Sequence, residues 1–194
     1  MKQVSLFLAD GFEDIEALAT RDILLRGGVD VLTVSLNDDP LVTSAHGLQV
    51  FADTCLDDFL DDEADGNGYS ETLMIFPGGM PGSKNLGDCA PLMELMNRRY
   101  TEGAALAAIC AAPGYVLSHL DDVAGQTFTC YDGVEQMLID KGARFVRQPA
   151  VVSGRIITGR GPGHVTDFAL TLLAFLEGQA AADRVARAMT LPCA

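Results

Sequence analysis

The sequence predicts an α/β fold in which helices cover both faces of a mainly parallel sheet. Short, wholly apolar segments of strand length recur along the chain, and segments of helical length lie between most of them. The chain has 194 residues, 48% of them hydrophobic, and no repeat, linker or low-complexity tract divides it. We therefore expect a single domain over residues 1–194 with a sizeable core.

The chain opens with a strand–helix–strand unit. Gln3–Ala9 is expected as a strand and Asp10–Gly11 as the turn after it. A helix is expected from about Asp14 to Arg26, ended by Gly27–Gly28, and a second strand over Val29–Leu36. This order predicts a parallel pair of strands. The apolar positions near helical spacing are Ile15, Leu18, Ile23 and Leu24.

The next segment has a weaker pattern. Leu41–Ala52 is expected to form a hairpin of two short strands around His46–Gly47, at an edge of the sheet. Asp53–Asp65 holds seven acidic residues in thirteen and runs into the turn at Gly66–Gly68. Because the alternating D-x-D-x-D-G pattern of an EF-hand is absent, we expect a solvated loop with about one helical turn there, not a calcium loop.

The remaining elements continue the alternation. The expected strands are Thr72–Phe76, Ala104–Ile109, Phe128–Thr129 and an Ala150–Thr158 hairpin or bulged strand. The expected helices are Ser83–Leu86, Ala90–Thr101, a helix after Cys110 to about His119, Asp132–Lys141, Val165–Leu176 and Gln179–Met189.

The charge balance excludes several classes of partner. Acidic residues outnumber basic ones 27 to 13, which gives a net charge of −14. Such a surface repels phosphate backbones and anionic lipid, so we expect neither nucleic acid nor a membrane as partner. The N-terminal apolar run ends at Asp10, too early for a secretory signal or a membrane span, so we expect a cytoplasmic location.

The cysteines favour a reducing compartment. Their number is odd and no CxxC spacing occurs, which indicates free thiols and argues against a disulfide framework or a zinc site. They are Cys55, Cys89, Cys110, Cys130 and Cys193.

Cys110 lies where an apolar strand is expected to turn sharply into a helix. The strand is Ala104–Ile109, and the small residues Ala111, Ala112 and Pro113 suit a first helical turn. This geometry is similar to the nucleophile elbow of α/β hydrolases. N–H groups at a helix start favour a thiolate, so we expect a pKa below that of a free thiol. The alternative is a buried structural cysteine.

Four expected loops leave the carboxyl ends of the strands, where open parallel sheets bind ligands. They bring carboxylates, a thiol and glycine-rich backbone to one edge, which are the parts of a covalent-catalysis site with an oxyanion hole. The loops are Asp10–Glu16, Pro77–Gly82, Cys110–Pro113 and Gly159–His164.

Glu16 is the carboxylate that could face the thiol. It lies one turn into the first helix, and a carboxyl group beside a thiolate should have a raised pKa and share its proton with the sulfur. The alternative is a carboxylate that stabilises the helix dipole, an explanation that suffices for Glu13 and Asp14.

A conventional Cys–His dyad is not evident, because none of the three histidines follows Cys110 directly. His119 is expected at the end of a helix and His46 in the hairpin turn. His164 follows a loop at the catalytic edge and is the candidate by position.

With these residues in view, the chain resembles the DJ-1/ThiJ/PfpI family, a branch of the class I glutamine amidotransferase-like fold. The matching motifs are L-A-D-G-F-E-D-I-E (Leu8–Glu16), F-P-G-G (Phe76–Gly79), A-A-I-C-A-A-P (Ala107–Pro113) and G-R-G-P-G (Gly159–Gly163). They match in order and spacing over essentially the whole chain. The resemblance implies a flavodoxin-like three-layer sandwich, usually as a homodimer.

The resemblance also implies roles for individual residues. Cys110 would be the reactive cysteine and Glu16 its hydrogen-bonded carboxylic-acid partner. The backbone of Gly79 and Ala111, with Gly78, would form the anion pocket.

Further positions follow from the same resemblance. Arg26 matches a basic position associated with the dimer interface. The accessory candidates are His164, Arg160, His46, where many members carry Arg, and Cys130, near a position at which deglycase-type members can carry His.

The activities that the family implies need no metal or other cofactor. They are glyoxalase or deglycase chemistry on 2-oxoaldehydes or their adducts, oxidative-stress sensing and chaperone action, and some members carry a legacy ThiJ label. The PfpI peptidases have His directly after the nucleophile, whereas Ala111 stands here, which argues against a peptidase. The alternative to an enzyme is a redox sensor or chaperone in which Cys110 is oxidised to the sulfinate.

Overall fold

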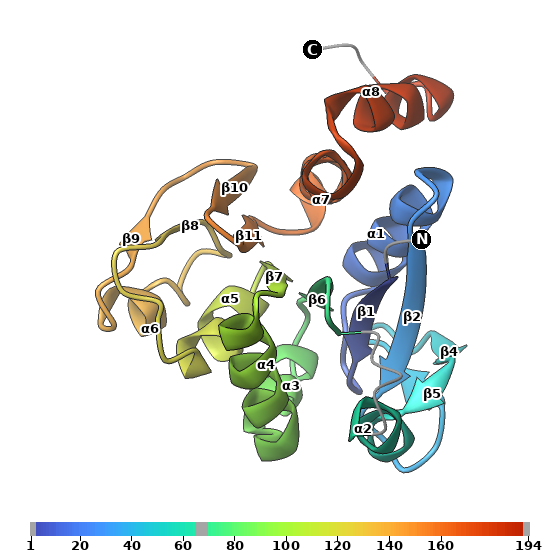
Figure 1. The fold of residues 1–194 in the computed structure, drawn as a ribbon, viewed down its shortest axis with the longest axis vertical. Coiled ribbons are helices and arrows are strands. Elements are labelled where there is room, and N and C mark those ends of the chain that lie inside the picture. Colours follow the sequence, from blue (N-terminus) through green and yellow to red (C-terminus); the bar gives the residue numbers. More distant parts are fainter. Residues whose placement is uncertain (1–2, 65–69, 192–194) are drawn as a thin grey trace.

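The computed structural model describes residues 3–64 and 70–191, whose fold is shown in Figure 1. The strands are β1 (Gln3–Leu8), β2 (Asp30–Ser35), β3 (Leu41–Thr43), β4 (Gln49–Phe51), β5 (Thr54–Cys55), β6 (Leu73–Phe76), β7 (Ala105–Ile109), β8 (Thr127–Phe128), β9 (Arg144–Phe145), β10 (Ala150–Ser153) and β11 (Ile156–Gly159). The α-helices are α1 (Asp14–Arg26), α2 (Leu56–Ala64), α3 (Gly82–Asp88), α4 (Ala90–Glu102), α5 (Ala112–Tyr115), α6 (Gln136–Ile139), α7 (Val165–Glu177) and α8 (Gln179–Ala188). Two 3₁₀ turns, Leu117–His119 and Pro162–His164, follow α5 and precede α7.

A seven-stranded sheet runs through the molecule in the order β10-β11-β7-β6-β1-β2-β5. Each neighbouring pair is parallel except β10 and β11, which form the predicted hairpin. The predicted α/β arrangement, a mainly parallel sheet with helices on both faces in the flavodoxin-like manner, is confirmed.

The two faces of the sheet carry separate hydrophobic cores. Side chains alternate between them along each strand, as the pleat requires: on β7, Ala107 and Ile109 belong to one core and Leu106 and Ala108 to the other. Helices α1, α7 and α8 cover the first core, and α2, α3, α4 and α5 cover the second. Both sides are visible in Figure 1. Burial on both faces explains why the central strands are continuous apolar runs.

Helix α1 has the predicted bounds but a different buried face. Glu13 caps its start by accepting the N–H of Glu16 at 2.8 Å, and Gly27 caps its end. Ile15 and Leu18, expected to face the core, are 53% and 40% exposed. The buried stripe is instead Glu16, Ala17, Thr20, Ile23 and Leu24, which recurs at helical spacing but includes two polar residues. The apolar pattern alone therefore misplaced the helix face.

The acidic segment is a helix, so the prediction of a solvated loop was wrong. Leu56 and Phe59 are buried one turn apart on α2, and Asp57 and Asp58 occupy its first turn, where carboxylates stabilise the helix dipole. Glu63, also buried, pairs with Arg99 of α4. The part of the prediction that covers residues 65–69 lies outside the described residues.

Three smaller expectations also need correction. The hairpin around His46–Gly47 forms, but β3 and β4 make a two-stranded sheet of their own, and β5 occupies the edge beside β2. The helix expected over Asp132–Lys141 shortens to the four residues of α6. The helix after Cys110 divides into α5 and a 3₁₀ turn.

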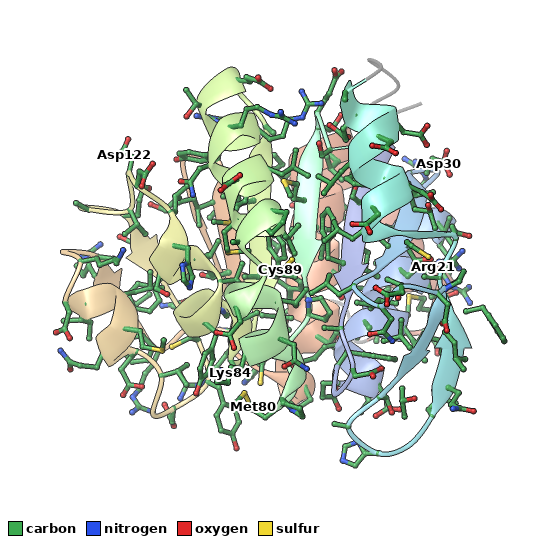
Figure 2. All side chains as sticks on the ribbon, turned by 90° about the horizontal axis from the view of Figure 1, so that it is seen from below. Arg21, Asp30, Met80, Lys84, Cys89 and Asp122 are labelled. Carbon is green, nitrogen blue, oxygen red and sulfur yellow. The ribbon has the colours of Figure 1, made fainter. Side chains whose placement is uncertain are left out.

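The parallel strands place their carboxyl ends at one edge of the sheet. Figure 2 shows this separation of the two ends: Asp30, at the start of β2, lies at the opposite side of the molecule from Met80, in the loop after β6. Within the described residues, no helix is long and apolar enough to cross a membrane.

Candidate active site

Cys110 occupies the sharp turn between β7 and α5. Its φ of +64° is the left-handed conformation, which non-glycine residues rarely adopt. The backbone is held on both sides: Cys110 N–H donates to Gly159 O at 3.0 Å, and Tyr131 N–H donates to Cys110 O at 2.8 Å. The predicted strand-to-helix turn is therefore present.

Glu16 approaches this turn from α1. Its side chain is almost completely buried, at 1% exposure, and its Oε2 accepts the backbone N–H of Gly78 at 2.8 Å. Glu16 and Cys110 interact through their side chains. The other carboxyl oxygen of Glu16, Oε1, forms no hydrogen bond with a described residue. It is therefore the oxygen that can carry a proton.

The approach depends on the absence of a side chain at Gly78. A Cβ there would lie 2.4 Å from Glu16 Oε2 and 2.5 Å from Cys110 Cβ. Both distances are far below van der Waals contact, so the loop after β6 can lie against the carboxyl and the thiol only with glycine at this position.

Burial is the main cause of a raised pKa at Glu16. Removal from water disfavours the carboxylate, and the negative charge of Glu13 adds to the effect. The interactions with Cys110 and the Gly78 N–H oppose it, and the pKa is about 7. The pKa of Glu16 is therefore raised as expected, but burial and the charge of Glu13 raise it, whereas the contact with Cys110 lowers it.

The pKa of Cys110 moves in the direction opposite to our expectation. Burial raises it first, and the charge and hydrogen bond of Glu16 raise it further, to about 12, against the lowering effect of the Gly79 and Ala111 N–H groups. The expectation considered only the helix start and omitted desolvation and the neighbouring carboxylate. The two groups together keep one proton well above neutral pH, so a thiolate forms there chiefly when that proton sits on Glu16.

Two backbone N–H groups of the predicted anion pocket act on the sulfur. Those of Gly79 and Ala111 both lower the pKa of the Cys110 thiol. Cys110, Glu16, Gly78, Gly79 and Ala111 thus meet at one point of the carboxyl edge. This arrangement can stabilise negative charge on sulfur or on an oxygen bound next to it.

A cavity of about 490 Å³ lies beside the Cys110 turn. Arg160 Nη2 pairs with Asp132 at 2.7 Å in its wall. His164 is 3.4 Å from Asp167. In the described part of the chain, neither Arg160 nor His164 forms a hydrogen bond or ion pair with Cys110. The cavity is lined by Tyr131, Asp132, Arg160, Gly161, Pro162, Gly163 and His164.

The other predicted positions lie apart from the thiol's own contacts. His46 is exposed and pairs with Asp14. Cys130 is fully buried, and burial is the first cause that raises its pKa to about 12. Arg26 pairs with Asp22 at 2.6 Å on the exposed face of α1.

Sequence reasoning missed Tyr131 as part of the site. Its N–H fixes the Cys110 carbonyl and its side chain lines the cavity. The signal was weak, since residue 131 follows a two-residue strand in a segment with little regular structure.

The chain is similar to known proteins over most of its length. The model of the DJ-1/PfpI family matches residues 2–175. Protein DJ-1 homolog A of Arabidopsis thaliana is 34% identical over 98% of this chain and 47% of its own length. The chain spans less than half the length of this relative and of the Arabidopsis homolog B.

In two further matches the alignment covers most of this chain and most of the related protein. A glutathione-independent glyoxalase of Caenorhabditis elegans is 33% identical over 86% of this chain and 83% of its own. The solved structure of a cysteine-to-alanine mutant of a DJ-1 superfamily protein from Salmonella typhimurium is 32% identical, with a TM-score of 0.89 and complete coverage of both chains. This chain therefore belongs to the DJ-1/PfpI family.

Proposed function

We propose that this protein is a cofactor-free enzyme of glyoxalase or deglycase type, which uses Cys110 to act on 2-oxoaldehydes or their adducts. The observation that carries the proposal is Glu16, a buried carboxyl with a pKa of about 7 beside the thiol. Such a group can take up and return a proton near neutral pH. The name of the Caenorhabditis elegans relative, a glyoxalase that works without glutathione, supports this class of activity.

In the first step, ionised Glu16 accepts the thiol proton while sulfur adds to the aldehyde carbon. A C–S bond forms and the carbonyl π pair moves to oxygen, where the Gly79 and Ala111 N–H groups stabilise the charge. Glu16 then gives the proton to that oxygen, which leaves a neutral hemithioacetal and a carboxylate ready for the next transfer.

The remaining steps need only proton transfer and water. Glu16 moves the hydrogen on the former aldehyde carbon to the neighbouring carbon by way of an enediol, which converts the hemithioacetal to a thioester. Hydrolysis of the thioester releases a 2-hydroxy acid and restores the thiol. The net reaction of methylglyoxal with water gives lactate, so no external oxidant or reductant is required.

Conversion of methylglyoxal to lactate by purified protein tests this proposal. Cys110→Ser should abolish turnover, Glu16→Gln should lower it about a hundredfold or more, and Glu16→Asp should also lower it. Cys89→Ser is the matched control and should keep wild-type turnover, because this thiol lies outside the site. If Glu16→Gln leaves turnover intact, or loses turnover and melting temperature in step, Glu16 has only a structural role.

A non-enzymatic redox sensor or chaperone is the second candidate, and the burial of Cys110 favours it. The thiol is 8% exposed, so a large substrate cannot reach it. Peroxide is small, and a sulfinate there would accept hydrogen bonds from Gly79, Ala111 and a protonated Glu16. Saturable lactate formation supports the enzyme; a stoichiometric reaction, with two oxygen atoms gained in the intact mass after mild peroxide, supports the sensor.

The cytoplasmic location and the homodimer remain predictions. Free thiols at Cys55, Cys89, Cys110 and Cys130 support a reducing compartment.

A further inference from the structure

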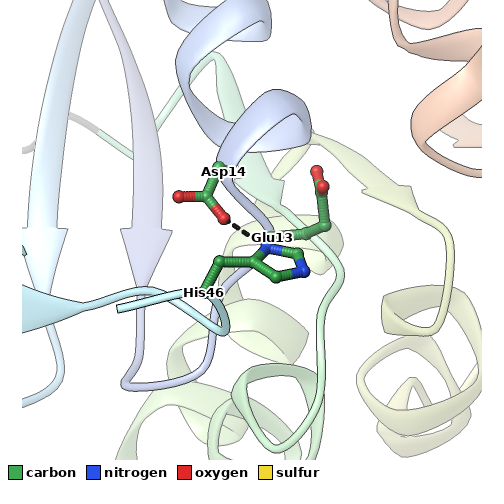
Figure 3. Close-up of side chains that lie close together, drawn as sticks. All are labelled: Glu13, Asp14 and His46. Atoms are coloured by element: carbon green, nitrogen blue, oxygen red, sulfur yellow. Dashed lines mark hydrogen bonds and ion pairs between the residues drawn. The ribbon is translucent and has the colours of Figure 1, made fainter. Parts of the chain in front are cut away.

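Three side chains with metal-binding atoms converge at the start of α1, outside the thiol site. Glu13 and Asp14 come from the helix start and His46 from the turn between β3 and β4, and one ligand atom of each lies within 4.8 Å of the others. Figure 3 shows the imidazole of His46 against the carboxylate of Asp14, with Glu13 beside them. The cluster thus combines two segments that are 32 residues apart.

A hydrogen bond from outside the cluster orients one oxygen of each carboxylate. Asp14 Oδ1 accepts the hydroxyl of Ser44 at 2.8 Å, and its Oδ2 lies 2.8 Å from His46 Nδ1. Glu13 Oε2 accepts the N–H of Glu16 at 2.8 Å, which leaves Oε1. Hydrogen bonds of this kind orient the ligands in protein metal sites.

The turn that carries His46 is fixed by the same serine. Ser44 Oγ accepts the N–H of His46 at 3.2 Å and of Leu48 at 3.0 Å, so one hydroxyl positions both the turn and the Asp14 carboxylate. The His46 side chain is 75% exposed, which leaves a path for a hydrated ion and room for bound water.

We propose that Glu13, Asp14 and His46 form a Zn²⁺ site with water as the fourth ligand. One imidazole and two carboxylates suit Zn²⁺, whereas Ca²⁺ and Mg²⁺ prefer oxygen ligands alone. Asp14 Oδ2 and His46 Nδ1 lie 2.8 Å apart, at hydrogen-bond distance, so a bound Zn²⁺ would replace the proton between them and move the two atoms slightly apart. A bound dication offsets the two carboxylate charges gathered there.

The molecule contains a matched control for a simple ion pair. His164 Nδ1 lies 3.4 Å from the carboxylate of Asp167, but both residues belong to one helix start and a single carboxylate is involved. Among the described residues a histidine–carboxylate contact therefore occurs at His46 and at His164, and of these two the one at His46 has a second carboxylate and an orienting serine.

Calorimetric titration of the protein with Zn²⁺ tests the proposal, together with the absorption spectrum of Co²⁺ bound in its place. We expect one Zn²⁺ per chain at this site, a loss of affinity of at least about tenfold in His46→Ala, and a similar loss in Asp14→Asn. Glu13→Gln keeps an oxygen acceptor for the helix cap and should also weaken binding. His164→Ala should bind Zn²⁺ as the wild type does.

The spectrum separates this site from zinc on a thiol. Co²⁺ held by nitrogen and oxygen lacks the near-ultraviolet charge-transfer band that a thiolate ligand produces. Absence of that band, with loss of Co²⁺ binding in His46→Ala, supports the site. The proposal is overturned if His46→Ala and wild type bind Zn²⁺ equally, if the thiolate band accounts for the bound Co²⁺, or if no Zn²⁺ binds.

Discussion

Gly78 and Glu16 are in contact through a 2.8 Å hydrogen bond from the glycine N–H to Oε2, and a Cβ on residue 78 would lie 2.4 Å from that same oxygen. The bond and the missing side chain together allow a carboxyl on α1 to be buried beside a thiol that follows β7. Geometry at this one glycine therefore links the loop after β6 to both reactive groups.

Gly78→Ala should damage the site by displacing Glu16 or the Cys110 turn. Overpacking of this kind costs about 1–3 kcal/mol of unfolding free energy, and turnover should fall as well. Urea unfolding and the lactate assay measure the two effects. Gly163→Ala is the control for stability, because a Cβ there meets no described atom within 4 Å. Equal stability of Gly78→Ala and wild type would contradict the steric argument.

Much of the fold could be predicted from the sequence because local pattern and topology agree. Wholly apolar strands indicated a sheet buried on both faces, and a parallel sheet brings the strand ends together at one edge. That reasoning alone placed Cys110, the glycine-rich loop after β6 and Glu16 at the same edge. The turn at Cys110 was readable because small residues and a proline follow an apolar run.

The remainder depended on contacts between distant segments. The helix α2 is held by Leu56 and Phe59 in the core and by Glu63 against Arg99, 36 residues away, which its acidic composition did not indicate. Glu16 is buried on α1 although it is polar, so the apolar pattern of the helix did not indicate which face is buried. The pKa of Cys110 followed from burial and a remote carboxylate, whereas the prediction used only the local helix start.

The raised pKa of Glu16 predicts a specific pH dependence of stability. Between about 4.5 and about 7 the folded protein binds this proton more than the unfolded chain does. The stabilisation is therefore complete below about 4.5 and is lost as the pH rises through about 7, up to about 3 kcal/mol. Because Gln does not titrate, the unfolding free energy of wild type minus that of Glu16→Gln should fall over this range.

Urea unfolding at several pH values across this range measures the difference. Glu94→Gln, which changes an exposed carboxylate on α4, should follow the wild type throughout. A wild-type minus Glu16→Gln difference that stays constant would mean that Glu16 has a normal pKa in the folded protein, and one that grows with pH would mean a lowered pKa; either result contradicts the prediction.

A homodimer is expected to form through α1 and the β3–β4 hairpin. Ile15, Leu18 and Leu25 are exposed on one helix, and Leu48 and Phe51 on the hairpin, Phe51 at 79%. Large apolar side chains that are exposed on neighbouring elements are typical of interfaces, and we expect these to be covered in the dimer. Sedimentation should give twice the single-chain mass of 20.6 kDa. The double variant Leu18→Ser/Phe51→Ser should shift it towards the single chain, whereas Val152→Ser, on the opposite sheet edge, should not. A wild type that sediments as a single chain refutes the dimer.

The alkylation of Cys110 should depend on the charge of Glu16. Burial is the largest cause of the raised pKa of Cys110, and the negative charge of Glu16 is the next. Glu16→Gln removes that charge and keeps the burial, so the pKa of Cys110 should fall and the pH profile of alkylation should move to lower pH. Iodoacetamide rates from about pH 6 to about pH 10, read by mass spectrometry of the Cys110 peptide, give the profile. Cys89 in the same samples serves as the internal reference and should keep its own profile. If the Cys110 profile stays in place or moves to higher pH, the carboxylate charge does not act on the thiol, and the shared proton on which the proposed chemistry depends is absent.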